Sequence, residues 1–407
     1  MKTVIIADDL TGACDTAVKL CGGGRSVNVY LNNQIAKIEE PGAAINTNSR
    51  SLSPEEAFEK LSVIARELKR QSGIRIYKKI DSLFRGNVTV EAEALRTILG
   101  YQSILINSAV PGNHRAVRNG KLSAPDSICD GLDIIPSVFC GKEEECVSIP
   151  LETVRAGSAA LAAEIEKFIS AGIKYLIVDS ETEADLTVSA EAAGLFEDTV
   201  LPAGAAGFIA PLAKIQKCRS RKTNERNLRK KNGGPLLFVL GTNNPVTVNQ
   251  IKHLKRVENV PMVTVHAKEI LSGKTAAERN RCISEAECIM QSDPELLLLT
   301  VAETDSETPA PVFDAAAENA EIAACCTDIA VSLAETFPFR GMVVSGGTTA
   351  QLLLEKMRIP SLTVLSEFAP GIPIAKIESR QYESMLIATK SGGYGEKETL
   401  SDLKAYL

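Results

Sequence analysis

The sequence contains few of the residues that mark metal sites, disulfide frameworks and membrane spans. Its 407 residues include three histidines and ten scattered cysteines with no C-x-x-C pair, which argues against a zinc site and a disulfide framework. No apolar run reaches about 18 residues, and no basic segment followed by an apolar one follows Met1, so we expect neither a membrane span nor a signal peptide. These absences predict a reduced, cytoplasmic protein.

Aromatic residues are also scarce, at 4% of the chain with no tryptophan. Because apolar residues make up 44%, the cores must be aliphatic, as in sheets that helices cover on both faces. The formal net charge of −6 provides no global attraction to nucleic acid. We therefore expect no nucleic-acid partner and no membrane partner, and an anionic substrate would need a local basic pocket.

Short apolar runs alternate with helical patterns along the whole chain, which favours an α/β fold with mostly parallel sheets. The clearest boundary is a basic segment, residues 217–234, which we interpret as a linker because the whole chain is acidic. It predicts two α/β domains, residues 1–216 and residues 235–407, with an interdomain cleft. Leu201–Gly207, just before the linker, is predicted to be a loop that opens a helix.

The apolar runs and helical patterns give definite expected bounds. The predicted strands are Thr3–Ala7, Val27–Leu31, Ala43–Asn46, Ile74–Lys78, Ser103–Asn107, Tyr175–Asp179, Leu236–Leu240, Met262–Val265, Leu296–Thr300, Gly341–Val344, Leu362–Val364 and Ser384–Ala388. The predicted helices include Ala13–Leu20, Pro54–Gln71, Val88–Leu99, Leu161–Ala171 and Ala350–Met357.

The first predicted strand, Thr3–Ala7, ends in two adjacent carboxylates, Asp8 and Asp9. Acids at the carboxyl end of the first strand of an open α/β sheet lie where such sheets bind ligands. Because adjacent strand residues point to opposite sides, only one of the two can face a cleft directly. The alternative is that one or both cap the following helix.

Further polar turns follow predicted strands in the N-terminal half. Lys78–Asn87 combines two lysines, one aspartate, one serine, one arginine and one asparagine within ten residues. Asn46–Arg50 and Val110–Arg115 are two more such turns. This mixture suits a small polyhydroxy anion, because cations bind a carboxylate through charge-assisted hydrogen bonds while Asp and Ser bind hydroxyls. Surface loops with internal ion pairs are the alternative interpretation.

Glycine-rich turns characterise the C-terminal half. Gly241–Pro245, Ser345–Ala350 and Thr389–Gly395 each follow a predicted strand. Exposed backbone N–H groups and the positive end of a helix make such a turn an anion site, and phosphate is the usual ligand. Three of these turns in one domain favour nucleotide binding.

Four of these motifs together resemble the four-carbon acid sugar kinase family over essentially the whole chain: Ala7–Ala13, Lys79–Asn87, Ser345–Ala350 and Lys390–Gly395. The resemblance implies an N-terminal acid-sugar-binding domain and a C-terminal nucleotide-binding domain. It further implies an ATP-dependent kinase that phosphorylates the terminal 4-hydroxyl of D-threonate or erythronate, or alternatively of 3-oxo-tetronate. Where many family members carry Gly-Ser-Arg, this chain has Gly241–Asn243, which keeps a hydroxyl and loses a cation.

Matching the motifs residue by residue, together with the charge pattern, gives an expected site. The acid-sugar residues are Asp9, Arg50, Lys79, Ile80, Asp81, Ser82 and Arg85, and the nucleotide residues are Thr242, Ser345, Gly346, Gly347, Thr348, Lys390, Gly392 and Gly393.

In-line phosphoryl transfer asks a protein chiefly for positioning and charge neutralisation. Arg50, with Lys79 or Arg85, would hold the sugar-acid carboxylate, and either Asp9 or Asp81 would act as the base. Mg²⁺ is expected to bridge phosphate oxygens, and no dedicated set of protein metal ligands is expected. A homodimer is expected because it is the commonest arrangement of soluble enzymes.

Two other function classes compete with the kinase. A non-catalytic two-lobed sugar-acid sensor would explain the polar N-terminal turns, but it would leave the C-terminal glycine turns without a task. A dehydratase or aldolase would need metal ligands or a Schiff-base lysine in a dry pocket.

Overall fold

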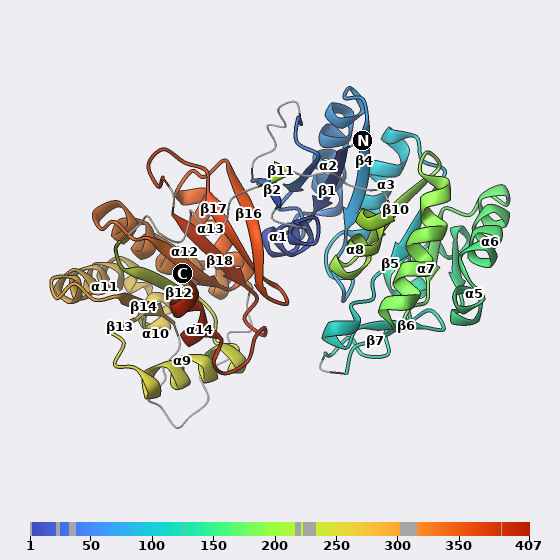
Figure 1. The fold of residues 1–407 in the computed structure, drawn as a ribbon. Helices are drawn as coiled ribbons and strands as arrows, with labels where there is room; N and C mark the ends of the chain where they lie inside the picture. Colours follow the sequence, from blue (N-terminus) through green and yellow to red (C-terminus); the bar gives the residue numbers. More distant parts are fainter. Residues whose placement is uncertain are drawn as a thin grey trace. The chain divides into compact units, whose positions relative to one another are not determined.

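The computed structural model describes residues 2–21, 25–31, 38–125, 127–215, 221–222, 233–301, 316–383 and 385–407. The chain divides into two compact units, Met1–Lys222 and Thr223–Leu407, each of which can be followed by colour in Figure 1. Most of the predicted linker, residues 217–234, lies outside the described residues. The exact domain bounds given by the sequence therefore stay a prediction.

The N-terminal unit is built on a parallel sheet with strand order β2-β3-β1-β4-β10-β5-β9-β8. A short antiparallel pair, β6 and β7, stands apart from it, and β11 joins β2 in antiparallel orientation. The strands are β1 (Lys2–Ala7), β2 (Arg25–Tyr30), β3 (Gly42–Asn46), β4 (Ile74–Lys79), β5 (Ser103–Asn107), β6 (Ala116–Arg118), β7 (Lys121–Ser123), β8 (Cys146–Ile149), β9 (Tyr175–Val178), β10 (Val200–Gly204) and β11 (Arg221–Lys222).

Helices lie on both faces of this sheet (Figure 1). α2 and α3 pack against each other and against one set of alternating strand side chains, which forms a large aliphatic core. α8 contacts both α1 and α7. The principal helices are α1 (Leu10–Val18), α2 (Pro54–Lys69), α3 (Val88–Leu99), α4 (Ile134–Val138), α5 (Leu151–Arg155), α6 (Ser158–Ser170), α7 (Glu183–Ala193) and α8 (Ala206–Ile215).

Local sequence explains where α2 begins. Ser53 caps the helix by accepting a hydrogen bond from the Glu56 N–H at 3.2 Å, and the Glu56 carboxylate accepts one from the Ser53 N–H at 3.0 Å. Pro54 occupies the first turn, where its missing N–H costs nothing. This reciprocal capping fixes the start of the helix where the sequence predicts it.

The prediction that Leu201–Gly207 is a loop is wrong for its first half. Val200–Gly204 forms β10, a central strand between β4 and β5, and α8 follows directly. Gly204 is needed for close approach and not for a turn, because a Cβ at this position would lie 2.2 Å from the Asn107 carbonyl oxygen. Glycine inside a strand often marks such an approach of another backbone.

The C-terminal unit contains a second sheet with strand order β13-β14-β12-β15-β18-β17-β16. The pairs from β13 to β18 are parallel, whereas β17 pairs antiparallel with both β18 and β16. The strands are β12 (Leu236–Leu240), β13 (Met262–Thr264), β14 (Leu296–Thr300), β15 (Gly341–Ser345), β16 (Ser361–Ala369), β17 (Ile372–Ile377) and β18 (Leu386–Lys390). The helices include α9 (Pro245–Val257), α10 (Ala267–Glu269), α11 (Thr275–Met290), α12 (Ala316–Thr336), α13 (Gly347–Lys356) and α14 (Thr399–Tyr406).

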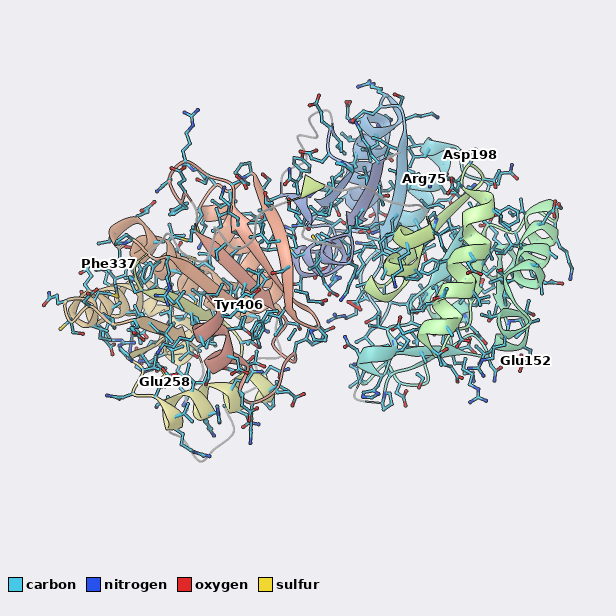
Figure 2. All side chains as sticks on the ribbon, in the orientation of Figure 1. Arg75, Glu152, Asp198, Glu258, Phe337 and Tyr406 are labelled. Atoms are coloured by element: carbon cyan, nitrogen blue, oxygen red, sulfur yellow. The ribbon has the colours of Figure 1, made fainter. Side chains whose placement is uncertain are left out.

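Helices cover this second sheet in two groups. α9 and α14 contribute buried leucine and isoleucine side chains to a core shared with β12, β14, β15 and β18. α12 contacts both α11 and α13. Tyr406 on α14, labelled in Figure 2, packs its ring edge-on against Phe368 with ring centroids 5.1 Å apart.

The fold predicted from the sequence, two α/β domains with mostly parallel sheets, is confirmed. Most predicted strands appear within one or two residues of their expected ends. The strand expected over Ser384–Ala388 is Leu386–Lys390, and Ser384 itself lies outside the described residues. Within the described parts of the chain, no helix is long and apolar enough to cross a membrane.

Candidate functional site

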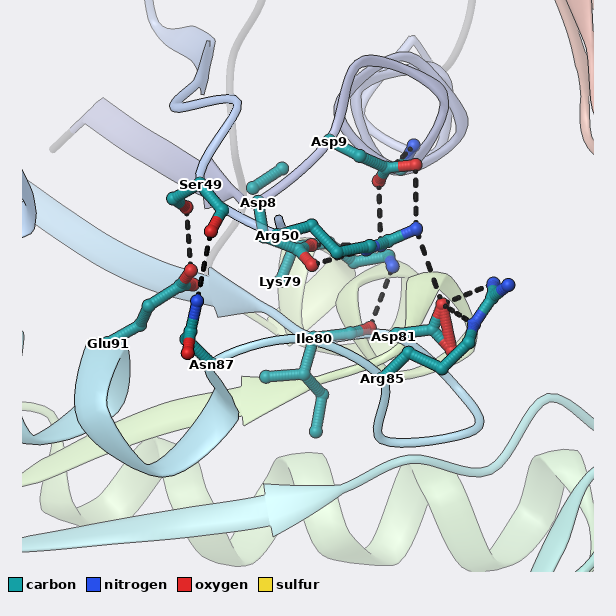
Figure 3. Close-up of polar contacts among 12 residues, drawn as sticks. Asp8, Asp9, Ser49, Arg50, Lys79, Ile80, Asp81, Arg85, Asn87 and Glu91 are labelled. Atoms are coloured by element: carbon teal, nitrogen blue, oxygen red, sulfur yellow. Dashed lines mark hydrogen bonds and ion pairs between the residues drawn. The ribbon is translucent and has the colours of Figure 1, made fainter. Parts of the chain in front are cut away.

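The polar turns that follow β1, β3 and β4 meet at the topological switch point of the N-terminal unit. β1 is flanked by β3 and β4. From β1 the chain passes through α1 to β2 and β3 on one side, and from β3 it crosses through α2 to β4 on the other side. A crevice forms outside the carboxyl ends of the strands at such a point and is the usual ligand site of open α/β sheets. The carboxyl ends of β1, β3 and β4 carry Asp8 and Asp9, Arg50, and Lys79 to Asp81, respectively (Figure 3).

Arg50 is the centre of this cluster, because its guanidinium contacts three carboxylates. Its Nε and Nη2 donate to the two oxygens of Asp8 at 2.6 and 3.0 Å. Its Nη1 donates to Asp9 Oδ2 at 3.0 Å, and the same nitrogen lies 3.5 Å from Asp81 Oδ2. With a side chain only 25% exposed, Arg50 binds protein carboxylates with most of its donors.

Asp8 and Asp9 both contact Arg50, but the Asp8 side chain is 4% exposed and that of Asp9 is 23% exposed. The expectation that only one of the two faces a cleft directly stays a prediction. The strand ends at Ala7, before the two acids. Asp9 has extended backbone angles as the N-cap of α1, and its Oδ1 accepts a hydrogen bond from the Gly12 N–H at 3.0 Å. Asp9 therefore caps the helix and contacts Arg50 at once. Asp8, which the sequence offers as a candidate but does not place among the expected acid-sugar residues, belongs to the same cluster.

Asp81 and Arg85 form a second pair at the end of β4. Arg85 donates from Nε and Nη2 to Asp81 Oδ2 at 3.0 and 2.6 Å, and the Leu83 N–H donates to Asp81 Oδ1 at 2.8 Å. The Arg85 side chain is 61% exposed whereas that of Asp81 is 6% exposed. Arg85 is thus the most accessible cation of the cluster. The half-buried Ser82 hydroxyl makes no hydrogen bond within the described chain.

Lys79 and Ile80 complete the predicted acid-sugar segment. Lys79 is buried, and its Nζ donates to the Ile80 carbonyl oxygen at 2.7 Å. Three cations, those of Arg50, Lys79 and Arg85, therefore balance the three carboxylates of the cluster. A cluster that is neutral by itself and has one exposed cation can accept a further anionic group.

The surroundings separate the pKa values of the acids. Burial would raise the pKa of Asp8, but the charges of Lys78 and Arg50 outweigh it and lower that pKa. Burial also opposes ionisation of Asp81, yet the Arg85 hydrogen bond and the Arg50 charge lower its pKa. For Asp9, burial and the neighbouring Asp8 charge prevail over Arg50, and the pKa is raised. Asp9 is thus the more basic of the two acids that sequence reasoning left open.

A buried polar network supports the cluster from within the unit. Lys78 and Glu91 form an ion pair at 2.7 Å with both side chains 1% exposed. Glu91 also accepts a hydrogen bond from the Ser49 hydroxyl at 2.6 Å, and the neighbouring Thr47 hydroxyl donates to the Ala7 carbonyl at 2.9 Å. The network joins β1, β3, β4 and α3, and so fixes the loop that carries Arg50. Sequence reasoning assigned it no role.

Two glycines make room for these carboxylates. A Cβ on Gly12 would lie 2.5 Å from Asp9 Oδ1 and 3.1 Å from Lys79 Nζ. A Cβ on Gly86, which has a φ of +87°, would lie 3.0 Å from Arg50 Cγ and 3.2 Å from Asp8 Oδ2. The Thr-Gly and Arg-Gly pairs of the sequence are therefore packing requirements of the cluster.

The third polar turn, Val110–Arg115, follows β5, which is separated from β4 by β10. Its ends pair with each other, and His114 has a left-handed φ of +54°. Among the described residues, the Ser108 hydroxyl and Arg115 Nη1 are buried without a hydrogen-bond partner. The prediction that this turn lines the same site stays a prediction.

In the C-terminal unit, the three glycine turns converge. They follow β12, β15 and β18, which are neighbours in the sheet. The Gly241 N–H donates to the Ser345 carbonyl at 3.1 Å, and the Gly346 N–H donates to the Lys390 carbonyl at 3.1 Å. A Cβ on Gly392 would lie 2.7 Å from Thr242 Oγ1. The predicted nucleotide residues of these turns are therefore brought together.

The turn after β15 opens α13 without a side-chain cap. Gly346 is the N-cap residue with a φ of +111°, and within the described parts of the chain no side-chain cap accepts a hydrogen bond from the start of the helix. Gly347 and Thr348 form the first turn of α13, at its positive end. Free N–H groups at this end can bind an anion.

The turn after β12 is held by its own hydroxyl and amide. Thr242 Oγ1 accepts from the Asn244 N–H at 3.2 Å, and Asn244 Oδ1 caps α9 by accepting from the Val246 N–H at 3.0 Å. A Cβ on Gly241 would lie 2.2 Å from Thr349 Oγ1. Asn244 and Thr349 are contacts of this cradle that sequence reasoning missed.

The donor set favours a polyanion, because the glycine cradle supplies N–H groups and hydroxyls without carboxylates. Over the ranges that the structure describes, no group of three or more histidine, cysteine, aspartate or glutamate side chains could hold a metal ion.

Comparison with known proteins agrees with the division of the chain into two units. Residues 3–131 and 133–212 match a family model described as a sugar-binding N-terminal domain. Residues 237–400 match a model described as a nucleotide-binding C-terminal domain.

Curated relatives align over almost the whole chain. The D-threonate kinase of Cupriavidus necator is 25% identical over 415 residues, covering 98% of this chain and 96% of that protein. The D-erythronate kinase of Heliobacterium modesticaldum is 24% identical over 437 residues, covering 100% and 97%. The 3-oxo-tetronate kinase of Salmonella typhimurium is 24% identical over 420 residues, covering 98% and 97%.

Two solved structures share the fold. A Salmonella typhimurium LT2 protein, described provisionally as a tRNA synthase, superimposes with a TM-score of 0.79 at 22% identity, covering 99% of this chain and 98% of its own. A Haemophilus influenzae protein superimposes with a TM-score of 0.71 at 20% identity, covering 99% of each chain. At these identities the likeness concerns the fold alone.

Proposed function

Because the chain belongs to the four-carbon acid sugar kinase family, we propose that it transfers the terminal phosphoryl group of ATP to the 4-hydroxyl of D-threonate or D-erythronate. Kinase activity toward four-carbon sugar acids follows from the family, and the acceptor and the position phosphorylated are our proposal. The observation that carries it is the contrast between the two sites. One is a charge-balanced carboxylate cluster, and the other is a glycine cradle whose described residues carry no carboxylate.

The N-terminal cluster suits the acceptor. In this proposal Arg85, the exposed cation, binds the sugar-acid carboxylate, because Arg50 already donates to Asp8 and Asp9. The remaining lone pairs of Asp9 and the free Ser82 hydroxyl bind the sugar hydroxyls. Arg50 then has a different task from the one expected, since it orients the carboxylates.

We assign the base to Asp9. Its side chain is 23% exposed, and its raised pKa favours acceptance of a proton. Both oxygens of Asp81 are bound by Leu83 and Arg85, and its pKa is lowered. Asp9 would accept the proton of the 4-hydroxyl as that oxygen attacks the terminal phosphorus of ATP.

The C-terminal cradle suits the phosphoryl donor. The N–H groups at the start of α13 and of the Gly392–Gly393 turn would bind phosphate oxygens, and Thr242 would hold the turn that faces them. Mg²⁺ bound to phosphate oxygens would supply further charge neutralisation. Phosphoryl transfer requires the 4-hydroxyl of the sugar acid to contact the terminal phosphate of ATP. A measurement of kinase activity tests whether this contact forms.

A coupled assay tests the proposal. Purified protein is incubated with ATP, Mg²⁺ and, in separate arms, D-threonate, L-threonate, D-erythronate and 3-oxo-tetronate, and the product is examined by phosphorus NMR. We expect turnover with D-threonate or D-erythronate and a phosphate ester at C4. Turnover with 3-oxo-tetronate alone would replace the proposed acceptor, and no ATP-dependent product in any arm would end the proposal.

Two further expectations concern the oligomeric state and the cellular location of the protein. A homodimer and a cytoplasmic location stay predictions from the sequence. Sedimentation velocity at several protein concentrations would measure the oligomeric state directly, and a monomer at all concentrations would contradict the first of them.

A further inference from the structure

Lys390 carries a buried positive charge whose hydrogen bonds all go to neutral oxygens. Its side chain is buried at the carboxyl end of β18, with the residue 1% exposed. Nζ donates to Thr247 Oγ1 at 2.9 Å, to Ser345 Oγ at 3.2 Å and to the Ser391 carbonyl at 3.2 Å. These three acceptors use the three donors of an ammonium group, so the charge is fixed in place.

Lys78 provides a comparison within the same chain. It is equally buried, but Glu91 lies 2.7 Å from its Nζ. No carboxylate of the described residues forms an ion pair with Lys390. A buried charge without a counter-charge destabilises a fold, so its retention here needs another reason. An anionic ligand that binds nearby would provide one.

The position of Lys390 identifies where that anion would lie. Its carbonyl accepts the Gly346 N–H at the start of α13, and its ammonium reaches the Ser345 hydroxyl one residue earlier. The ammonium charge of Lys390 therefore lies next to the glycine turn that begins α13. The uncapped helix end and the ammonium contribute positive potential to the same place.

The hydrogen bonds around Ser345 limit the directions in which its hydroxyl can donate a proton. The Thr247 hydroxyl donates its proton to the Gly392 carbonyl at 2.7 Å. Ser345 Oγ accepts from Lys390, so its own proton can go to Thr247 Oγ1, 3.2 Å away, or to a ligand anion. Binding of an anion would draw that proton toward the ligand.

We propose that Lys390 is a positioning residue for the phosphates of the nucleotide: it touches no phosphate oxygen, but its charge attracts them and its hydrogen bond aims the Ser345 proton at them. This inference rests on the proposed function. It gives Lys390 an electrostatic role, so the contribution of Lys390 to ligand affinity should increase with the negative charge of the ligand.

A charge series of ligands tests the inference. Affinities of adenosine, AMP, ADP and a nonhydrolysable ATP analogue are measured by calorimetry for the wild type and Lys390→Met, without sugar acid. We expect a loss of about tenfold for the ATP analogue, smaller losses for ADP and AMP, and none for adenosine. Equal losses for all four ligands, or none, would overturn the proposal. Lys252→Met, which removes an exposed lysine from α9, is the matched control and should leave all four affinities unchanged.

The stability of the free protein separates this task from a structural one. Removing an unpaired buried charge should leave the thermal midpoint of Lys390→Met at or above that of the wild type, whereas a lysine needed only for folding would lower it. Lys390→Gln, which keeps a polar group without the charge, should lose the same ligand affinities. Nucleotide affinities unchanged in both variants would contradict the proposal.

The wild type offers a test that needs no substitution. Burial lowers the pKa of Lys390 to about 8. The groups that face its Nζ are the Thr247 hydroxyl from α9, the Ser345 hydroxyl from β15 and the Ser391 carbonyl, none of which titrates near that pH. Affinity for the ATP analogue should therefore fall between about pH 7 and about pH 9.5, while that for adenosine stays constant. A flat profile would overturn the inference. Absence of any nucleotide binding by the wild type would instead count against the proposed function.

Discussion

Asp9 Oδ2 accepts a hydrogen bond from Arg50 Nη1 at 3.0 Å, yet the pKa of Asp9 lies above the ordinary aspartate value. Burial and the adjacent Asp8 charge together outweigh the guanidinium. Asp8, which has the stronger contact with Arg50 and lies near Lys78, has a lowered pKa. The pKa values of two neighbouring acids that share one cation are thus shifted in opposite directions. Such a difference commonly distinguishes a structural acid from one that acts as a base.

The first prediction concerns the base. Asp9→Asn should lower kcat by about 10²- to 10⁴-fold, since general base catalysis typically contributes that much. KM for the sugar acid should change little, and the fold should persist because asparagine can still cap α1. Asp81→Asn should act mainly on KM, because Asp81 holds Arg85. Steady-state kinetics of both variants, with the exposed Asp198→Asn as control, decide the matter. A larger kcat loss in Asp81→Asn would exchange the two roles.

The pH dependence follows from the same assignment. The base must be ionised, so kcat/KM falls as the pH drops through the pKa of Asp9. Because that pKa is raised, the acid limb should lie above the ordinary aspartate value of about 4. The limb should persist in Asp81→Asn and vanish in Asp9→Asn. A profile measured in buffers of constant ionic strength gives the answer, and an acid limb below pH 4 in the wild type would speak against Asp9.

Arg50 and Arg85 should differ sharply in their contribution to stability. Arg50→Met leaves buried carboxylates without their shared cation and should lower the free energy of unfolding at neutral pH by about 3–5 kcal/mol. Their folded-state pKa values would then exceed the unfolded ones, so the penalty should shrink as the pH falls through those raised values. Arg85→Met, at an exposed position, should cost less than about 1 kcal/mol.

Urea unfolding at several pH values measures both variants. Kinetics add a second comparison, since Arg85→Met should raise KM for the sugar acid although it barely changes stability. Equal unfolding free energies for the two variants would mean that Arg50 does not organise the cluster.

The glycine cradle gives a prediction about the nucleotide alone. Gly241→Ala would place a Cβ 2.2 Å from Thr349 Oγ1, which must force the turn after β12 away from the start of α13. KM for ATP should rise at least about tenfold, while binding of the sugar acid is retained. Gly194→Ala, whose Cβ would meet its nearest atom only at 3.4 Å, is the matched control. Unchanged KM for ATP in Gly241→Ala would place the nucleotide elsewhere.

The sequence predicts the strands well where apolar runs are flanked by polar turns. Ser103–Asn107, Leu236–Leu240 and Leu296–Thr300 have the predicted bounds, because each is an apolar run buried in the middle of a sheet. The sequence does not predict β10, because Pro202 and Gly204 are residues typical of a loop. Only the tertiary structure reveals that Gly204 lies against the Asn107 carbonyl.

The candidate sites were predicted unevenly for a related reason. Motifs locate the ends of strands, so Asp9, Arg50 and Asp81 are found together as expected. Partners distant in sequence are invisible to a motif, and so Glu91 is not assigned a role. Whether a cation is free is equally hidden: Arg50 was expected to hold the substrate, but the structure shows its donors directed at protein carboxylates.

The ion pair of Lys78 and Glu91 limits how this scaffold can be re-engineered. Replacing either partner alone leaves an uncompensated charge in the interior, at a cost of about 3–5 kcal/mol, which is a large share of the stability of a typical domain. Libraries aimed at new acceptors should therefore diversify the half-buried Ser82 and the exposed Arg85 and leave both buried partners untouched, or exchange the two in a single step. Most clones that vary one partner would be lost to misfolding before any new specificity could be screened.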